Sequence, residues 1–210
     1  MSKFFVVFDV DSTLIEDEVI ELLADVAGRR AEVAAVTGRA MAGELDFSAS
    51  LIERVATLEG LPERVFTDVL QKVTVTKGAA ELIHRIHEAG GRAGAVSGGF
   101  TQVLTPLADR LGLDFARAND LEVIDGKLTG KVMGQIVDKS VKAQSLLEWA
   151  ERIGFSQAQT VAVGDGANDL EMMSWAGLSV AFNAKPIVKA SADIVLQNSN
   201  LEEIADLLGV

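Results

Sequence analysis

The 210-residue sequence contains no cysteine and only three prolines. The lack of cysteine excludes disulfide bonds and thiolate metal sites. A metal ion bound here would therefore be a hard cation held by oxygen ligands, and magnesium fits best. Because prolines are so few and 49% of the residues are hydrophobic, we expect a globular chain without long disordered linkers. Its length allows one sizeable core, or one domain that carries a smaller insertion.

Long apolar segments and excess positive charge are also missing. No apolar run approaches the roughly 18 residues that a membrane-spanning helix needs, and the start Met1-Ser2-Lys3 has no signal-peptide layout. We therefore expect a cytoplasmic protein without a membrane partner. With 31 acidic and 19 basic residues the net charge is −12, which argues against binding to nucleic-acid phosphates. An anionic substrate would need local positive charge from a metal ion, a lysine and backbone amides.

One stretch near the start combines a buried strand with two carboxylates. The apolar run Phe4–Phe8 is followed by Asp9-Val10-Asp11-Ser12-Thr13. Such a run predicts a strand buried on both faces of a parallel sheet, and the carboxyl ends of these strands are where ligands bind. If the backbone stays extended, both carboxylates point to the same side and need a cation or a shared proton. Alternatively, these polar residues are ordinary turn formers and helix caps.

The next 60 residues or so have helical periodicity, with four apolar stripes. Short helices must bury their stripes on one another, so we expect residues 15–75 to form a small helical bundle inserted as a cap above the strand end. The four stripes consist of Val19, Leu22, Leu23 and Val26; Val33, Val36 and Ala40; Leu51, Ile52, Val55 and Leu58; and, in a helix opened by Pro62, Val65, Phe66, Val69 and Leu70.

After the cap, helices and strands alternate. This pattern predicts an α/β fold with a doubly wound, mostly parallel sheet, in which residues 1–14 and 76–210 form a Rossmann-like core. Asp125-Gly126 between two short strands predicts a β-hairpin. The remaining expected strands are 93–96, 113–118, 160–163, 178–182 and 193–196, the hairpin strands are 121–124 and 127–132, and the expected helices lie around 82–86, 103–111, 141–153 and 201–208.

Two more strands end in polar residues. Strand 160–163 is followed by Gly164-Asp165-Gly166-Ala167-Asn168-Asp169. If it lies beside the first strand, Asp165 joins Asp9 and Asp11 in an oxygen-rich site suited to one Mg²⁺. Strand 93–96 is followed by Ser97-Gly98-Gly99, whose hydroxyl and free amides at the next helix start could bind phosphate oxygens. Each motif alone also fits a plain turn, and spacing does not choose a partner lysine among Lys139, Lys142, Lys185 and Lys189.

Together these motifs resemble those of the haloacid-dehalogenase-like phosphatases and, within them, the phosphoserine phosphatases. The family's first motif, Asp-x-Asp-x-Thr, matches Asp9–Thr13; its second matches Ser97-Gly98-Gly99-Phe100; and its fourth matches Gly164–Asp169. Its lysine near the helix start before the fourth motif matches Lys142, which we prefer to the other lysines. The cap residues that the family assigns to the serine head group match Glu18, Met41, Phe47 and Arg54.

The resemblance implies a Mg²⁺-dependent phosphatase that hydrolyses O-phospho-L-serine to L-serine and phosphate in serine biosynthesis. Glu18 would suit the ammonium and Arg54 the carboxylate of the substrate, although by themselves both look like ordinary solvated helix charges. Other implied roles are Asp9 as the nucleophile that becomes an aspartyl phosphate; Asp11 as the acid and then the base; Asp9, Asp165 and the backbone carbonyl of Asp11 as metal ligands; Ser97, the Gly98 amide, Lys142 and Asn168 around the phosphoryl group; and Asp169 orienting Lys142.

Two alternatives remain at this point. The same site could transfer the phosphoryl group or act on another small phosphomonoester. From a different class, an acidic cluster with a serine and a lysine on a doubly wound sheet could belong to a signalling receiver module that stores an aspartyl phosphate, although the helical insertion and the extra length count against it. We expect a monomer or a homodimer, with no N-terminal regulatory domain.

Overall fold

The computed structural model describes residues 3–41 and 44–210 and, for Met41, only the backbone. Its centre is a seven-stranded sheet in the order β4-β3-β2-β1-β5-β6-β7. All neighbouring strands pair in parallel except β3 and β4, which confirms the predicted fold class. The strands are β1 (Phe5–Phe8), β2 (Arg92–Phe100), β3 (Phe115–Ile124), β4 (Lys127–Met133), β5 (Thr160–Gly164), β6 (Leu178–Phe182) and β7 (Ile194–Leu196).

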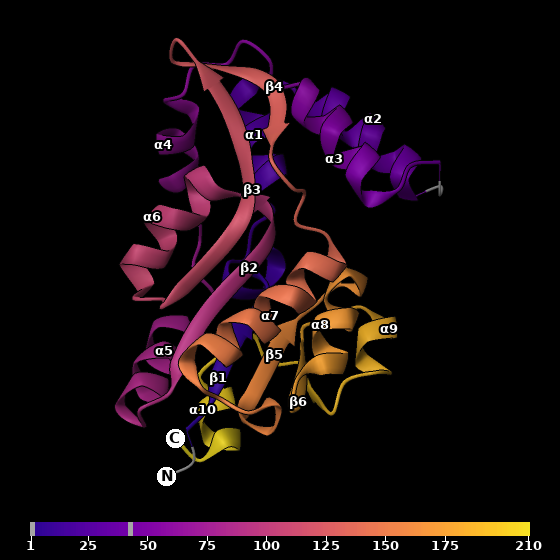
Figure 1. Ribbon diagram of the computed structural model, residues 1–210. Coiled ribbons are helices and arrows are strands. Elements are labelled where there is room, and N and C mark those ends of the chain that lie inside the picture. Colours follow the sequence, from indigo (N-terminus) through magenta and orange to yellow (C-terminus); the bar gives the residue numbers. More distant parts are fainter. Residues whose placement is uncertain (1–2, 42–43) are drawn as a thin grey trace.

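Helices cover both faces of this sheet (Figure 1). In the central strand β1, Val6 and Phe8 belong to one apolar cluster and Phe5 and Val7 to the other, because successive side chains point to opposite faces. None of these four side chains is exposed. No helix within residues 3–41 and 44–210 is long and apolar enough to cross a membrane. The first face carries α5 (Ala79–Glu88), α6 (Thr101–Leu111) and α10 (Glu203–Leu208), and the second α7 (Lys139–Ile153), α8 (Leu170–Trp175) and α9 (Pro186–Lys189).

In the described part of the interval predicted for the cap, residues 15–75, the structure forms four α-helices. The two ends of this interval meet, because Ile15 and Val75 form an isolated antiparallel bridge. Figure 1 shows two of the helices, α2 and α3, projecting away from the sheet. The division into a core and a cap as separate domains stays a prediction. The helices are α1 (Val19–Ala27), α2 (Arg30–Met41), α3 (Phe47–Ala56) and α4 (Val65–Leu70).

Two details of the predicted cap are wrong. Ile52 was placed in an apolar stripe, but its side chain is 51% exposed on α3. Pro62 does not open α4, which begins at Val65; it instead forms an isolated bridge with Lys127 of the hairpin. The second error has a clear cause, because Pro62 pairs with the tip of the β3–β4 hairpin, which is distant in sequence.

The hairpin itself forms at the predicted turn. Asp125 and Gly126 both adopt positive φ angles, 51° and 71°, as a two-residue turn between antiparallel strands requires. Its backbone is also joined to the segment between α3 and α4. The three bonds run from Gly60 N to Leu128 O (2.8 Å), from Leu128 N to Leu61 O (2.9 Å) and from Glu63 N to Gly126 O (2.9 Å).

Strand β2 extends four residues beyond its predicted end at Val96. It continues through Ser97-Gly98-Gly99 to Phe100, where it pairs with Asn119 of β3 after a shift of register. Helix α6 begins only at Thr101. The expectation that the amides of Gly98 and Gly99 lie at a helix start is therefore wrong, because both glycines belong to β2, where the Asn119 side chain donates to the Gly98 carbonyl at 2.9 Å.

Candidate active site

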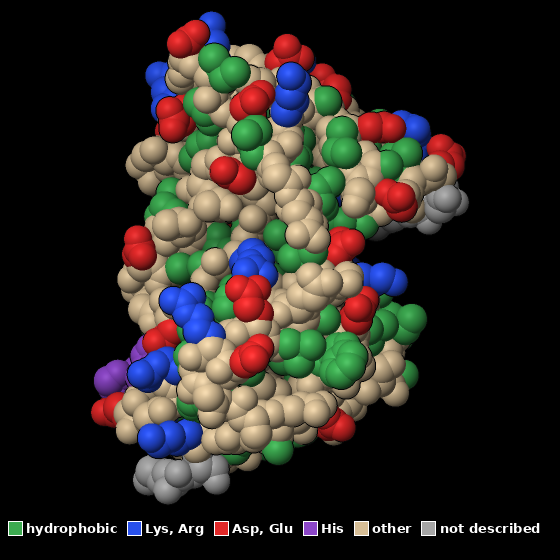
Figure 2. All heavy atoms as spheres, in the orientation of Figure 1, with side chains coloured by type: hydrophobic (Ala, Val, Ile, Leu, Met, Phe, Trp, Pro, Cys, Tyr) green, Lys and Arg blue, Asp and Glu red, His purple; other side chains and the backbone are tan. Residues whose placement is uncertain are grey.

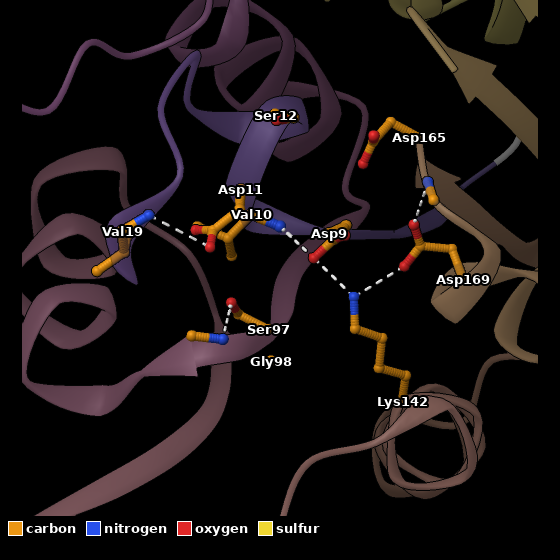
Figure 3. Close-up of polar contacts among 12 residues, drawn as sticks. Asp9, Val10, Asp11, Ser12, Val19, Ser97, Gly98, Lys142, Asp165 and Asp169 are labelled. Carbon is orange, nitrogen blue, oxygen red and sulfur yellow. Dashed lines mark hydrogen bonds and ion pairs between the residues drawn. The ribbon is translucent and has the colours of Figure 1, made fainter. Parts of the chain in front are cut away.

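Strands β1 and β5 lie side by side, which meets the condition under which the sequence places Asp165 beside Asp9. Phe8 pairs with Val163, and the amide of Asp9 donates to the carbonyl of Val163 at 2.8 Å. The carboxylates that follow the two strands therefore lie at the same edge of the sheet. Asp9, Asp165 and Asp169 each place one oxygen within 4.8 Å of the others (Figure 3). Sequence reasoning had assigned Asp169 only to Lys142 and had missed it as a member of this cluster.

The turn after β1 separates the two aspartates of the first motif. The backbone of Asp9 and of Asp11 is extended, whereas Ser12 adopts a φ of 57°. Asp11 and Ser12 both lie within the wide helical turn Val10–Leu14 and interrupt its helical geometry. The Asp9 side chain accepts a hydrogen bond from the Val10 amide at 2.7 Å. The Asp11 carboxylate accepts from the amide of Val19 at the start of α1, at 3.4 Å. Figure 3 shows Asp9 pointing toward Lys142 and Asp11 toward Val19, so the two carboxylates have different surroundings.

Lys142 lies between two carboxylates in the interior. Its Nζ is 2.7 Å from Asp9 Oδ1 and 2.8 Å from Asp169 Oδ1, and its side chain is 1% exposed. The second oxygen of Asp169 accepts from the amide of Gly166 at 3.0 Å, which holds that carboxylate in place. Asp138 caps α7 by accepting from the amides of Ser140 and Val141, and Lys142 lies in the first turn of this helix. This geometry suits Asp169 to orient the lysine.

Of the three other candidate lysines, only Lys185 lines the active-site cavity. Its side chain is 69% exposed, and its Nζ lies 3.9 Å from Asp165 Oδ2. Lys139 and Lys189 are not among the lining residues. The preference for Lys142 therefore agrees with its central position, whereas the position of Lys185 at the rim could not be foreseen from spacing.

Two carboxylates of the cluster, Asp9 and Asp165, are costly to ionise without a cation. Burial raises the pKa of Asp9 to about 7; the charge of Asp169 adds to this, and the Lys142 ammonium opposes it. Burial also raises the pKa of Asp165 to about 6, against the opposing charge of Lys185. A divalent cation beside these groups would favour their charged forms. Since every side-chain donor is a carboxylate oxygen, the site fits a hard cation.

Asp11 differs from Asp9 because no cationic side chain of the described residues lies at hydrogen-bonding distance from it. Burial raises the pKa of Asp11 well above its usual range, and the charges of Glu18 and Asp9 raise it further. Among the described residues, neither Asp11 Oδ1 nor the hydroxyl of the neighbouring Thr13 has a hydrogen-bond partner, although both atoms are buried. Asp11 is thus suited to carry a proton into the cavity.

The carboxylates open into a cavity of about 230 Å³ between the core and the cap. Figure 2 shows the corresponding side of the molecule hollowed between the projecting cap helices and the core, with charged side chains of both signs at its edge. The cavity brings together most of the predicted site residues. The lining side chains from the core are Asp9, Asp11, Ser97, Gly98, Asp165 and Asn168, and those from the cap are Glu18, Phe47 and Arg54.

The cap residues reach this cavity from α1 and α3. Glu18 immediately precedes α1 and accepts a hydrogen bond from the Ser12 hydroxyl at 2.8 Å. Arg54 donates from Nε to the carbonyl of Ser50 at 3.2 Å. Met41 ends α2, and its side chain lies outside the described residues.

Sequence reasoning missed two apolar residues of the cavity wall. Ile20 and Leu51 line it with only 7% and 2% of their surface exposed. Leu51 had been assigned to a core stripe, and periodicity cannot distinguish a side chain buried under a cavity from one buried in a core. Ser97 also belongs to the wall, and its hydroxyl accepts from the Gly99 amide at 2.7 Å.

Comparisons with known proteins agree with this fold and site. The family model described as haloacid dehalogenase-like hydrolase matches residues 6–174. A phosphoserine phosphatase of Streptococcus thermophilus is 50% identical over 98% of the chain and 96% of its own length. One from Mycobacterium tuberculosis is 51% identical over the whole chain, which spans about half of that relative. The chain therefore belongs to the haloacid dehalogenase-like hydrolases and, within them, to the phosphoserine phosphatase family.

Two solved structures have the same architecture over nearly the whole chain. One is a substrate-bound phosphoserine phosphatase complex, and the other is a phospho-aspartyl intermediate analogue of phosphoserine phosphatase. Each is 42% identical to this chain, superimposes with a TM-score of 0.91, and covers 99% of both chains. The resemblance deduced from the three motifs is thus confirmed.

Proposed function

We propose that this chain hydrolyses O-phospho-L-serine to L-serine and phosphate, with Mg²⁺ as cofactor and an aspartyl phosphate on Asp9 as intermediate. The observation that carries the proposal is the contrast between two neighbouring aspartates. Asp9 is ion-paired with Lys142 at 2.7 Å, whereas Asp11 has a raised pKa and one carboxylate oxygen without a partner among the described residues. Family membership supports the same reaction.

The first half of the reaction uses the two aspartates for different tasks. Asp9 attacks phosphorus, so that a bond from its carboxylate to phosphorus forms while the bond to the serine oxygen breaks. Asp11 gives its proton to the departing oxygen. Lys142, held by Asp169, keeps Asp9 oriented and offsets negative charge at the phosphoryl group. Ser97, the Gly98 amide and Asn168 would contact the phosphoryl oxygens.

The second half returns Asp9 to its carboxylate form. Asp11, now ionised, removes a proton from water, and the resulting hydroxide attacks phosphorus and releases Asp9. Asp9, Asp165 and the backbone carbonyl of Asp11 would hold Mg²⁺. When bound, the ion supplies positive charge that stabilises the phosphoryl oxygens. The cap would close over the substrate to exclude water and open for product release.

Substrate selection belongs to the cap in this proposal. Glu18 would pair with the ammonium of phosphoserine and Arg54 with its carboxylate, while Phe47 and Met41 would enclose the space between them. Because these groups match a zwitterionic amino acid, we favour phosphoserine over other phosphomonoesters. A cytoplasmic location and a monomeric or homodimeric state are part of the same proposal.

The test is phosphate release from a panel of phosphorylated metabolites with Mg²⁺ and with added alcohol acceptors. We expect O-phosphoserine to have the highest kcat/KM and expect no transfer to the acceptors. The Asp9→Asn variant should be inactive, and turnover equal to wild type in that variant would exclude the covalent mechanism. A stable phosphoprotein without phosphate release would instead favour a receiver module.

A further inference from the structure

The backbone of Lys185 is held in place by a hydrogen bond, whereas its side chain, next to Asp165, is largely exposed to solvent. Its amide donates to the carbonyl of Asp165 at 2.9 Å, and it directly precedes α9, which begins with Pro186. Val188, one turn further, is fully buried and anchors this short helix. The ammonium group is nevertheless on a side chain that is 69% exposed, 3.9 Å from Asp165 Oδ2. The fold therefore positions the residue and leaves the charge able to move.

This side chain stands at the boundary between two cavities. The first is the active-site cavity, and the second, of about 460 Å³, has a lining of mixed polar and apolar side chains that also includes Asp165. Among residues 3–41 and 44–210, Asp165 and Lys185 alone line both. The second cavity is otherwise lined by Ser12, Glu16, Thr76, Phe182, Asn183, Ala184 and Ser199. Lys185 can consequently point toward either space without a change in the backbone.

The active-site cavity is lined by more acidic than cationic side chains, so the positive charge of Lys185 at its edge affects the approach of an anionic substrate. Four acidic side chains line it, and the cationic lining residues within the described part of the chain are Arg54 and Lys185. Arg54 belongs to the cap, and Lys142 is already paired with two buried carboxylates. In a protein of net charge −12, a phosphate group that approaches this cavity meets a repulsive field. Lys185 is the exposed cation on the core side of the entrance.

We propose that Lys185 is a positioning residue with two alternating partners. In the resting protein it neutralises Asp165 and competes with the divalent cation for that carboxylate. When substrate arrives, its ammonium captures the phosphate group at the entrance and guides it toward Asp9 before the cap closes. This inference rests on the proposed function for its second half, while the competition with the cation can be measured without any substrate.

The experiment compares Lys185→Ala and Lys185→Arg with wild type, and uses Lys189→Ala as the matched control. Lys189 is on the same short helix but does not line the active-site cavity. We expect kcat/KM for phosphoserine to fall about fivefold in Lys185→Ala with kcat nearly unchanged, and its dependence on ionic strength to become weaker. Lys185→Arg should retain most of kcat/KM, and Lys189→Ala should behave like wild type.

Calorimetric titration of the substrate-free protein with MgCl₂ gives the second readout. Removing the competing ammonium in Lys185→Ala should tighten Mg²⁺ binding about threefold. An unchanged salt dependence of kcat/KM overturns the capture role, and an unchanged Mg²⁺ affinity overturns the competition. If wild type does not hydrolyse phosphoserine at all, the proposed function fails, whereas the titration still decides the competition at Asp165.

Discussion

The ring of Phe47, at the start of α3 in the cap, occupies the space that a side chain on Gly98 of β2 would need. A methyl group at Gly98 would lie 2.8 Å from Phe47 Cζ, closer than carbon atoms normally approach. Since Phe47 is 37% exposed, its ring could move away, but it would then leave the cavity wall. The absence of a side chain on Gly98 thus lets the cap approach strand β2.

This contact predicts the effect of Gly98→Ala. We expect KM for phosphoserine to rise about tenfold. Overpacking of this size costs on the order of 1–3 kcal/mol, and here that free energy opposes closure of the cap over the substrate. The melting temperature should hardly change. In a Phe47→Ala background the same substitution should have little further effect, which steady-state kinetics of the four variants would reveal.

Gly38→Ala provides the matched control for that series. Gly38 lies in α2, and a methyl group there would meet no atom within 4 Å. Alanine favours the helix over glycine by about 1 kcal/mol, so this variant should be slightly more stable with unchanged KM. Equal KM values for Gly98→Ala and wild type would contradict the predicted contact between cap and strand.

Lys142→Met should destabilise the protein in a pH-dependent manner. The substitution keeps the volume but leaves Asp9 and Asp169 buried without their cation, which costs about 3–5 kcal/mol. Burial raises the pKa of Asp9 and the Lys142 ammonium opposes this, so removing the ammonium raises that pKa further, and the folded protein holds a proton that the unfolded chain releases. The loss of stability should therefore be larger at pH 8 than at pH 5.

Urea unfolding at the two pH values measures this effect in metal-free buffer. Lys139→Met is the control, because Lys139 is an exposed residue of the same helix with no partner role at the site. Its unfolding free energy should stay within about 0.5 kcal/mol of wild type. A similarly small change for Lys142→Met at pH 8 would mean that the buried ion pairs contribute little.

Short-range patterns in the sequence were sufficient to predict the strands and the turn that local residues determine. The buried run before Asp9, the matching strand before Asp165 and the Asp125-Gly126 turn each carry a short-range signal, and all three formed as predicted. The sequence did not determine that these two strands are neighbours, because strand order depends on contacts between distant segments; the structure places them side by side. The carboxylates could therefore be assigned to one edge of the sheet only under that condition.

Features that depend on distant partners could not be predicted. The glycines after Ser97 look like a turn, yet they lie in β2, where the Asn119 side chain of β3 donates to the Gly98 carbonyl at 2.9 Å. Asp169 lies near Asp9, and Lys142 of α7 bonds both carboxylates. Ile52 has the spacing of a core residue, but its side chain is 51% exposed.

Glu18→Gln should change the pH dependence of catalysis as well as substrate binding. The charge of Glu18 raises the pKa of Asp11, so its removal should lower that pKa. Asp11 would then lose its proton at lower pH, and the alkaline limb of the kcat/KM profile, which reports on the free enzyme, should move toward acid. Glu21→Gln, an exposed change one turn further along α1, should leave the limb in place. An alkaline limb that moves equally in both variants, or in neither, would contradict this coupling.

Mg²⁺ should stabilise the protein much more at pH 8 than at pH 5. Burial raises the pKa of Asp9 from the usual 3.8 to about 7 and that of Asp165 to about 6. The metal-free folded protein thus retains protons that the unfolded chain has lost, and its stability falls as the pH rises from about 4 to about 7. Metal binding must displace these protons, so the gain in stability is small in acid and approaches about 2.7 kcal/mol in base at 100 times the Kd.

Thermal unfolding with MgCl₂ or EDTA at several pH values measures the difference. Asp165→Asn should abolish most of the Mg²⁺ effect, whereas equal stabilisation at pH 5 and pH 8 would show that the cation does not bind to these carboxylates.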